Sequence, residues 1–352
     1  MELRNIPIPP IGPDEGLLRV EACGVCGSDR GAFGSTPSSP YIMGHEIVGH
    51  IEAIVERAAR RLSVEEGDRV LLEEYLPCGQ CSWCRSGAYR LCDVTDPYAG
   101  KDGLRRYGSM PLSVAPGLWG GYSQYLFLDA NTVMHKIQEG ISAAVWTMTL
   151  PLSNGYQWCR LQGGVEPGQT VVILGPGQQG LGCVVAAASS GAGNLVVVGL
   201  QSDELKLANA VKLGATATVM IDPQQGPDKM TNDVREATGG SGADLVVDVG
   251  AGNDDSVNLA LAIARKGGQV VTVGASGRKL GIDFKKISEK GLLIRGVRGH
   301  SYAAVDWAIQ AIGSRGSILE PMATDVGLSD LEKEMQAQGS EGPVHVALDP
   351  WL

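Results

Sequence analysis

Short apolar runs separated by turn-forming residues fill the first half of the chain. Stretches rich in Gly, Pro and Ser, such as residues 31–40 and 111–121, lie between these runs. Apolar or alternating runs that are bounded by turn residues are typical of strands. The pattern therefore predicts a β-rich unit with long loops. Its expected strands are Leu17–Val20, Ile47–Val55, Arg69–Leu72 and Tyr122–Leu128.

The pattern changes near Leu152, after which Val-rich runs alternate with helical segments. Continuous apolar strands that alternate with helices are typical of a parallel sheet covered on both faces. We therefore expect a doubly wound α/β unit here. The expected strands are Thr170–Leu174, Leu195–Leu200, Thr218–Ile221, Ala243–Val249, Gln269–Val273 and Leu292–Val297. The expected helices are Gly180–Ser190, Asp203–Leu213, Asp228–Ala237 and Val257–Ala264.

The end of the chain predicts one more helix and one more strand. Ser329-Asp330-Leu331-Glu332 has the spacing of a capping box. In that motif the Ser and Glu side chains bond backbone N–H groups at the start of a helix. A helix is therefore expected over Ser329–Gln338, followed by a strand over Val344–Leu348.

Length and charge narrow the class of protein. The 352 residues suggest two domains, at about 150 residues each. Lys and Arg number 29 and Asp and Glu number 39, which gives a net charge of −10. This balance argues against a nucleic-acid partner, which requires a basic surface, and against an anionic membrane surface.

Neither a membrane-spanning segment nor a secretory signal is visible in the sequence. No apolar run approaches the roughly 18 residues that a spanning helix needs. Residues Met1–Pro10 lack a basic region followed by an apolar one. We therefore expect a cytoplasmic protein, in which clustered cysteines indicate metal binding before disulfides.

A glycine-rich turn follows the expected strand Thr170–Leu174 and opens a helix. Gly175-Pro176-Gly177-Gln178-Gln179-Gly180 has the spacing G-x-G-x-x-G. The first Gly permits a tight turn, the second lets the backbone approach a pyrophosphate, and the third lets helix and strand pack closely. The helix N-terminus then offers free N–H groups to the phosphates. The motif predicts a site for NAD or NADP; a glycine turn without a ligand is the alternative.

The end of the second expected strand distinguishes the two coenzymes. A carboxylate at that point binds the ribose 2′-hydroxyl of NAD. The expected position falls at Gln201 or Leu200, and neither is acidic. Asp203 lies just past it, and Lys206 is the nearest cation along the sequence. No Arg is present to bind the 2′-phosphate of NADP, so the choice of coenzyme stays open.

Four cysteines are grouped with the spacing C-x2-C-x2-C-x7-C. Four thiolates close a tetrahedral site that selects zinc over hard cations, and a closed site is structural because no position remains for a substrate. Free thiols and disulfides are the alternatives. The spacing favours one structural zinc ion held by Cys78, Cys81, Cys84 and Cys92.

A second set of donors is divided between two short motifs. One is Cys26-Gly27-Ser28-Asp29 and the other is Gly44-His45-Glu46. Together they supply sulfur, nitrogen and oxygen donors and an acid that can orient the histidine, as an open catalytic zinc site requires. Neither motif alone establishes a metal site, because a lone histidine is more often structural.

These motifs resemble those of the zinc-dependent medium-chain alcohol dehydrogenases. They occur in the family's order across nearly the whole chain. The resemblance implies a GroES-like catalytic domain, an inserted Rossmann domain, and hydride transfer between an alcohol carbon and C4 of nicotinamide. The matching motifs are Gly24–Asp29, Gly44–Gly49, Glu66–Val70, the four-cysteine group, Gly120–Tyr125 and Gly175–Gly180.

The resemblance also implies domain boundaries and an assembly. Residues 1–152 would form the catalytic domain, with a structural zinc lobe at about residues 76–95. Residues 153–298 would bind NAD(P), and residues 299–352 would return to the catalytic domain. The family suggests a homodimer or homotetramer that acts on a small alcohol, aldehyde or ketone.

Single residues take roles through the same resemblance. Cys26 and His45 resemble two ligands of the catalytic zinc. Asp29 resembles the acid that orients His45, and Ser28 resembles the hydroxyl that bonds the substrate oxygen and starts the proton relay.

Further residues of this kind surround the coenzyme. Asn154 corresponds to a small polar residue near the nicotinamide. Gly274 and the backbone of Val297–Gly299 resemble the far wall of the nicotinamide pocket, with Arg298 and His300 beside it.

Three features depart from the family pattern. Leu150 stands where the family usually has a third zinc ligand, and Glu46 is the natural substitute because this glutamate lies close to the metal in the family. Gly31 replaces the relay histidine, so another group or water must carry the proton out. The family's opening strand would precede Leu3, which points to a truncated or rebuilt N-terminus.

Three functions are compatible with these motifs. The first is an NAD(P)-dependent alcohol dehydrogenase in which zinc acts as a Lewis acid. Leu150 and Gly31 motivate the second, an NADPH-dependent reductase of an activated double bond with weak or no catalytic zinc. The third is a non-catalytic dinucleotide-binding sensor. The first is favoured by the retained set of Cys26, Ser28, Asp29, His45 and Glu46.

Overall fold

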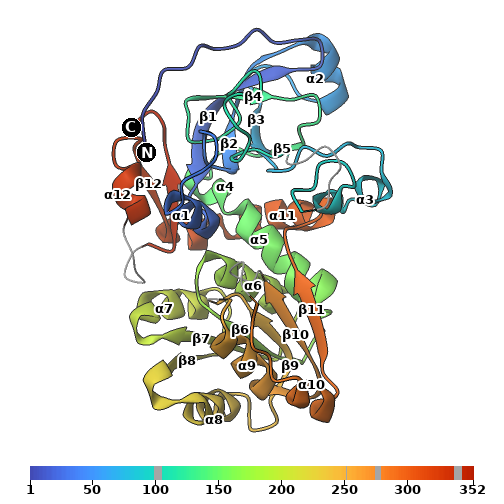
Figure 1. Cartoon of the computed structure of the whole chain (residues 1–352), viewed down its shortest axis with the longest axis vertical. Helices are drawn as coiled ribbons and strands as arrows, with labels where there is room; N and C mark the ends of the chain where they lie inside the picture. The colour runs from blue at the N-terminus through green and yellow to red at the C-terminus, as the bar shows by residue number, and fades with distance from the viewer. Residues whose placement is uncertain (99–104, 251, 274–278, 337–342) are drawn as a thin grey trace. The chain divides into compact units, whose positions relative to one another are not determined.

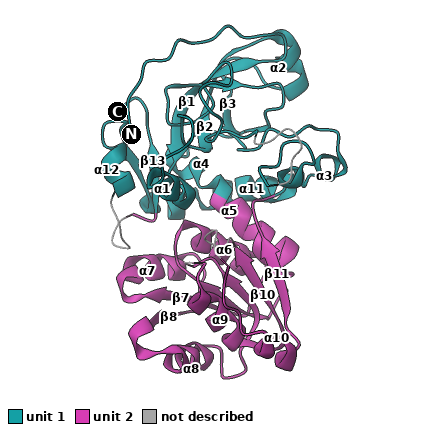
Figure 2. Ribbon diagram, in the orientation of Figure 1, with its two compact units in different colours: residues 1–150, 301–338, 345–352 teal, residues 151–300, 339–344 magenta. Residues whose placement is uncertain are grey.

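The computed structural model describes residues 1–98, 105–250, 252–273, 279–336 and 343–352. The chain divides into two compact units (Figures 1 and 2). The first comprises residues 1–150, 301–338 and 345–352, and the second comprises residues 151–300 and 339–344. Within the described ranges, no helix has the length and apolar character needed to span a membrane.

A seven-stranded sheet forms the frame of the first unit. Its central strand β1 (Gly16–Gly24) pairs antiparallel with β2 (Glu46–Ile54), β4 (Tyr125–Leu128) and β13 (His345–Leu348). The last strand of the chain therefore completes a sheet that the N-terminal half begins. The strand order is β12-β13-β1-β2-β3-β5, with β3 at Arg69–Leu72, β5 at Met134–Lys136 and β12 at Ala323–Val326.

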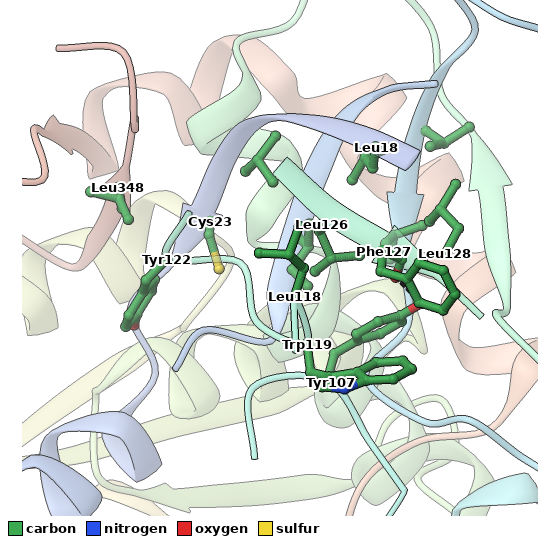
Figure 3. Close-up of a cluster of buried hydrophobic side chains, with 14 of the residues drawn as sticks. Leu18, Cys23, Tyr107, Leu118, Trp119, Tyr122, Leu126, Phe127, Leu128 and Leu348 are labelled. Carbon is green, nitrogen blue, oxygen red and sulfur yellow. Dashed lines mark hydrogen bonds between the residues drawn. The ribbon is translucent and has the colours of Figure 1, made fainter. Parts of the chain in front are cut away.

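The core of the first unit holds β1 in place. Side chains from β1, β4 and the segment before β4 meet in one buried cluster (Figure 3). The Trp119 ring meets the Phe127 ring edge to face with centroids 5.2 Å apart, and the Trp119 indole N–H donates to the Val114 carbonyl at 2.8 Å. Leu18 and Cys23 of β1 are fully buried in this cluster, which holds the C-terminal end of β1, and so the start of the following loop, in a defined position.

Most helices of the first unit are short. α11, which the sequence pattern did not predict, is the long one, and its buried positions include Ala304, Ala308 and Ile312. The helices are α1 (Gly27–Phe33), α2 (Glu56–Leu62), α3 (Ser82–Arg85), α4 (Ala143–Thr147), α11 (Tyr302–Leu319) and α12 (Leu331–Gln336). α5 (Thr149–Tyr156) begins at the end of this unit and continues into the second.

The second unit is a six-stranded, all-parallel sheet in the order β11-β10-β9-β6-β7-β8. The side chains of its central strands are buried almost throughout, as in a sheet covered on both faces. Its strands are β6 (Thr170–Leu174), β7 (Asn194–Leu200), β8 (Ala217–Ile221), β9 (Ala243–Asp248), β10 (Ala264–Val273) and β11 (Leu293–Val297). Its helices are α6 (Gln178–Ser189), α7 (Glu204–Lys212), α8 (Pro227–Ala237), α9 (Asp254–Ile263) and α10 (Phe284–Lys290).

The predicted fold class is confirmed: the first unit is built on a mixed β-sheet, and the second is an α/β unit with an all-parallel sheet. Two expected elements begin two or three residues later than the sequence suggested. The strand expected from Tyr122 begins at Tyr125, because the backbone N–H groups of Gly121 and Tyr122 bond the carbonyls of Gly44 and Met43 instead of a strand.

The C-terminal helix is the second correction. It begins at Leu331 rather than directly after Ser329, so the predicted capping box at Ser329 is wrong. Ser329 lies in a turn that is closed by the bond from Asp330 N–H to the Gly327 carbonyl. The expected end of this helix at residues 337–338 lies outside the described residues.

Lys290 closes the C-terminal end of α9. Its ammonium donates to the carbonyls of Leu261, Ala262 and Ala264 at 2.8, 2.6 and 2.8 Å. These carbonyls lie where a helix ends and lacks partners for its last acceptors. A cation at this end also interacts favourably with the helix dipole.

We predict that Lys290→Met lowers the free energy of unfolding by about 2 kcal/mol, because hydrogen bonds from a charged donor are lost. Urea denaturation monitored by circular dichroism measures the change. Lys285→Met is the control, since this exposed Lys on α10 lies 3.6 Å from Glu289 and should cost less than about 0.5 kcal/mol. Equal losses for both variants would contradict the role of Lys290.

Candidate metal centres and coenzyme site

The four-cysteine lobe is preorganised by its own backbone. Backbone N–H groups of Cys78, Cys81 and Cys84 donate to the sulfurs of Cys92, Cys78 and Cys81, each at 3.5 Å. The sulfur of Cys84 lies 3.9 Å from that of Cys78 and 3.4 Å from that of Cys81. Tetrahedral zinc with Zn–S bonds of about 2.3 Å requires sulfurs roughly 3.8 Å apart. The four thiols therefore fit a zinc ion.

Electrostatics at the lobe favour a thiolate at Cys92. Burial raises the pKa of this thiol, but hydrogen bonds from Thr95, Cys78 and Val94 outweigh burial and bring the pKa to about 6. At neutral pH Cys92 is therefore ionised, which is the form that binds zinc.

A buried carboxylate connects the lobe to the rest of the first unit. Glu73 is fully buried; it accepts a hydrogen bond from the Tyr89 hydroxyl and lies 2.7 Å from Nε2 of His135. The His135 ring packs on the ring of Tyr302, the first residue of α11. The backbone N–H of Tyr302 donates to the Gly87 carbonyl at 3.1 Å. The position of the lobe is thus fixed from two sides.

The second donor set comes together at the ends of β1 and β2. Gly24, the last residue of β1, pairs with Glu46, the first residue of β2. This register places Cys26, at the N-cap of α1, beside His45 and Glu46, and the ligand atoms of the three lie within 4.8 Å of one another. A Cβ at Gly24 would lie 2.2 Å from a Glu46 carboxylate oxygen, so only Gly leaves room for this arrangement.

Asp29 orients the parts of this site. Its Oδ2 accepts hydrogen bonds from the Cys26 N–H and the Tyr122 hydroxyl, both at 3.0 Å. Its Oδ1 lies 3.4 Å from Nδ1 of His45. A carboxylate on one ring nitrogen fixes the orientation of a ligand histidine and leaves the other nitrogen for a metal.

The pKa shifts show how strongly these groups interact. Burial raises the pKa of the Cys26 thiol, but the hydrogen bond and the charge of His45 outweigh this effect and leave the pKa below its ordinary value. Burial favours neutral His45, but Asp29 raises its pKa well above the usual range. Burial and the negative charge of Cys26 raise the pKa of Glu46 well above its ordinary value.

This donor set fits zinc. Thiolate, imidazole and carboxylate are the ligand types of catalytic zinc sites, which use three protein ligands and keep one open position. A divalent cation would also offset the repulsion between the buried negative charges of Cys26 and Glu46. Leu150, at the expected third-ligand position, is buried and is not among the donors grouped here.

Ser28 lies beside the same site. It is exposed in the first turn of α1, and its hydroxyl contributes to lowering the pKa of the Cys26 thiol. Gly31, on the same helix, has no heavy atom within 4 Å of an added Cβ.

The glycine turn of the second unit has the geometry that a phosphate needs. Gly175 has φ +99°, and a Cβ there would lie 3.0 Å from Gly250. A Cβ on Gly180 would lie 1.8 Å from the Gly175 carbonyl oxygen, so helix and strand meet there without side chains. Gly177, the N-cap of α6, faces open space, so its backbone can approach a ligand.

Asn154 links the glycine turn to the end of β11. Its amide N–H donates to Oε1 of Gln179 at 3.1 Å, and its Oδ1 lies 3.1 Å from Nδ1 of His300. Next to Asn154, a Cβ on Gly155 would lie 2.2 Å from the backbone of Gly182, so α5 and α6 touch backbone to backbone.

The remaining coenzyme candidates follow β7 and β11, two other strands of the same sheet. Gln201 is exposed directly after β7. Lys206 lies 3.2 Å from Asp203, which itself accepts a hydrogen bond from the Leu200 N–H. Val297 is buried at the end of β11, Arg298 follows it, and the Gly299 carbonyl accepts from the Trp158 indole at 3.0 Å. Gly274 lies outside the described residues.

Known proteins resemble this chain in both units. Residues 12–139 match the alcohol dehydrogenase GroES-like domain, and residues 180–314 match the zinc-binding dehydrogenase domain. The chain is 35% identical to a protein named as a probable alcohol dehydrogenase of Mycobacterium tuberculosis, over 99% of this chain and 95% of that protein. It is 32% identical to an erythritol/L-threitol dehydrogenase of Mycolicibacterium smegmatis, over 99% and 94% of the two chains.

A solved structure supports the same fold. A zinc-binding dehydrogenase of Sinorhizobium meliloti 1021, determined with bound NADP, superposes with a TM-score of 0.80 at 28% identity, covering 99% of this chain and 95% of that chain. The chain therefore belongs to the zinc-dependent medium-chain alcohol dehydrogenase family of NAD(P)-dependent oxidoreductases, which confirms the resemblance of its motifs.

We predict that Cys92→Ser removes one zinc ion per chain and lowers the melting temperature by several degrees. We expect zinc bound by the four thiolates to contribute folding energy to the lobe, because metal binding by such a site is coupled to its folding. Zinc analysis and thermal unfolding test this, with buried Cys183→Ser as a variant that should destabilise without loss of zinc. Variant enzyme that stays folded should keep most of its turnover; unchanged stability with abolished turnover would contradict a structural role.

Proposed function

We propose that the chain interconverts a small alcohol or polyol and its carbonyl compound at a catalytic zinc ion held by Cys26, His45 and Glu46. The observation that carries this proposal is the convergence of those three donors within 4.8 Å. The similarity to an erythritol/L-threitol dehydrogenase supports a polyol as one class of substrate. Zinc bound there would supply a Lewis acid that lowers the pKa of an alcohol hydroxyl.

The protein residues would then orient the metal ligands and move the proton. Asp29 would hold a zinc-bound His45 in the tautomer that carries its proton on Nδ1, through its contact with that nitrogen. Ser28, exposed beside Cys26, would accept the hydroxyl proton of the substrate. Because Gly31 carries no side chain that could continue the relay, solvent would take the proton from Ser28.

The second unit would bind the coenzyme that accepts the hydride. Gly175, Gly177 and Gly180 with the N-terminus of α6 would hold the pyrophosphate, flanked by Gln178 and Gln179. Asn154 and the segment Val297–Arg298 would surround the nicotinamide. Gln201 and Lys206 would face the adenosine ribose, where the amide of Gln201 suits either NAD or NADP.

We further propose the domain limits 1–152, 153–298 and 299–352, with the structural zinc lobe at about residues 76–95. We expect a homodimer or homotetramer in the cytoplasm. A net charge of −10 disfavours nucleic acid and anionic membranes as partners. Size-exclusion chromatography with light scattering measures the assembly directly.

Glu46→Gln tests the third zinc ligand. We predict that it lowers zinc content toward one ion per chain and reduces kcat/KM by about 100-fold or more, since an amide is a poor zinc ligand. Glu74→Gln is the control, because Glu74 is also buried but lies 3.2 Å from Arg106 and outside the donor group. If Glu46→Gln keeps both zinc and activity, Glu46 is not the third ligand. If in addition the parent protein binds only one zinc ion per chain, the alcohol dehydrogenase mechanism loses to reduction of an activated double bond.

Gln201→Asp tests the ribose contact. A carboxylate accepts hydrogen bonds from the ribose hydroxyls and repels a 2′-phosphate, so we predict that NAD binding improves by roughly 1–2 kcal/mol while NADP binding weakens. The ratio of kcat/KM for the two coenzymes measures the change. Ser202→Asp adds the same charge at the next exposed residue and should move the ratio less. An unchanged ratio in Gln201→Asp would show that Gln201 does not face the ribose.

A further inference from the structure

We propose that Tyr122 is a positioning residue for the catalytic zinc site, with its hydroxyl holding Asp29 so that the other carboxylate oxygen faces His45. This inference rests on the proposed function, because it concerns the same three ligands. Tyr122 lies far from Asp29 in sequence and comes from the Gly120–Tyr125 motif, in which no metal donor occurs. The contact between Tyr122 and Asp29 therefore appears only in the folded chain.

The two oxygens of Asp29 have different partners. Oδ2 receives the Tyr122 hydroxyl and the Cys26 N–H, both at 3.0 Å, while Oδ1 faces His45 at 3.4 Å. A single donor on Oδ2 leaves the carboxylate free to rotate about its last bond, whereas two donors from different directions hold its plane. Asp29 is only 4% exposed, so water cannot readily replace a lost donor.

The Tyr122 ring has a separate contact with the other ligand motif. A Cβ on Gly44, the residue before His45, would lie 2.5 Å from the Tyr122 ring, so the ring packs directly on the Gly44 backbone. The Tyr122 N–H also donates to the Met43 carbonyl at 2.9 Å. Figure 3 shows Tyr122 to one side of the hydrophobic cluster, away from Trp119 and Phe127.

One side chain thus contacts both ligand segments. The ring and backbone support the loop that presents His45, and the hydroxyl supports the acid that orients the same histidine. Direct partners of the ligands, such as Asp29, commonly change metal affinity by about 10–100-fold when they are lost. Since Tyr122 acts through Asp29, we expect an effect toward the low end of that range.

Tyr122→Phe separates these contributions, because it keeps the ring on Gly44 and removes only the hydroxyl. Tyr107→Phe is the matched control, since Tyr107 is a fully buried tyrosine whose hydroxyl donates to the Phe127 carbonyl at 3.0 Å and lies 2.6 Å from Thr132. Both variants lose a buried hydroxyl in the same unit. Only Tyr122→Phe should affect the metal site.

The measurement is the rate of zinc release to a chromogenic chelator, with thermal unfolding recorded in parallel. His45→Ala identifies the catalytic phase, which it should abolish, and Cys92→Ser identifies the structural phase. We expect Tyr122→Phe to accelerate the catalytic phase by about 10-fold, to leave the structural phase unchanged, and to lower kcat with little change in the coenzyme KM. Tyr107→Phe should lower the melting temperature and alter neither phase.

The outcomes separate the inference from the function on which it rests. If His45→Ala keeps both phases, the proposed zinc site itself is wrong. If His45→Ala removes one phase and Tyr122→Phe leaves that phase unchanged, Tyr122 is not a positioning residue. Slower zinc release in Tyr122→Phe would also overturn the inference. It would mean that the hydroxyl of Tyr122 weakens zinc binding by His45, because it draws charge from Asp29, instead of holding Asp29 in place.

Discussion

The antiparallel pairing of β1 with β2 is the constraint on which the metal site depends. Cys26 and His45 belong to different loops, and neither loop contains a complete set of ligands. The pairing of Gly24 with Glu46 brings the two loops to the same end of the strand pair. Because Gly24 has no Cβ, there is room beside it for the Glu46 carboxylate. The surrounding hydrophobic core therefore serves the chemistry indirectly, because it fixes the end of β1.

In the second unit, too, glycines allow the close packing on which a binding site depends. Phosphate binding requires exposed backbone N–H groups, and the turn after β6 provides them because glycines let β6 and α6 approach closely. Asn154 then connects this turn to the end of β11 through Gln179 and His300. Side-chain hydrogen bonds thus connect the ends of β6 and β11, which are not neighbouring strands in the sheet.

Local sequence was sufficient where one signal determined one element. β6 matches its predicted bounds because a short apolar run is enclosed by turn residues, and the four-cysteine spacing placed all four thiols within reach of one ion. α11 was not predicted because Gly313 and Gly316 interrupt its helical pattern, and packing determines the helix instead. Tyr122 could not be linked to Asp29, since no local spacing connects residues so far apart.

The contact between Gly155 and Gly182 has a consequence for how mutations in this chain would be interpreted. A side chain at either glycine would push α5 away from α6, and α5 carries Asn154. In a saturation mutagenesis screen for growth on the substrate, these two glycines would score like active-site residues. Neither offers a functional group, so their intolerance would reflect helix spacing, and sensitivity in such a screen would not by itself identify the residues that perform chemistry.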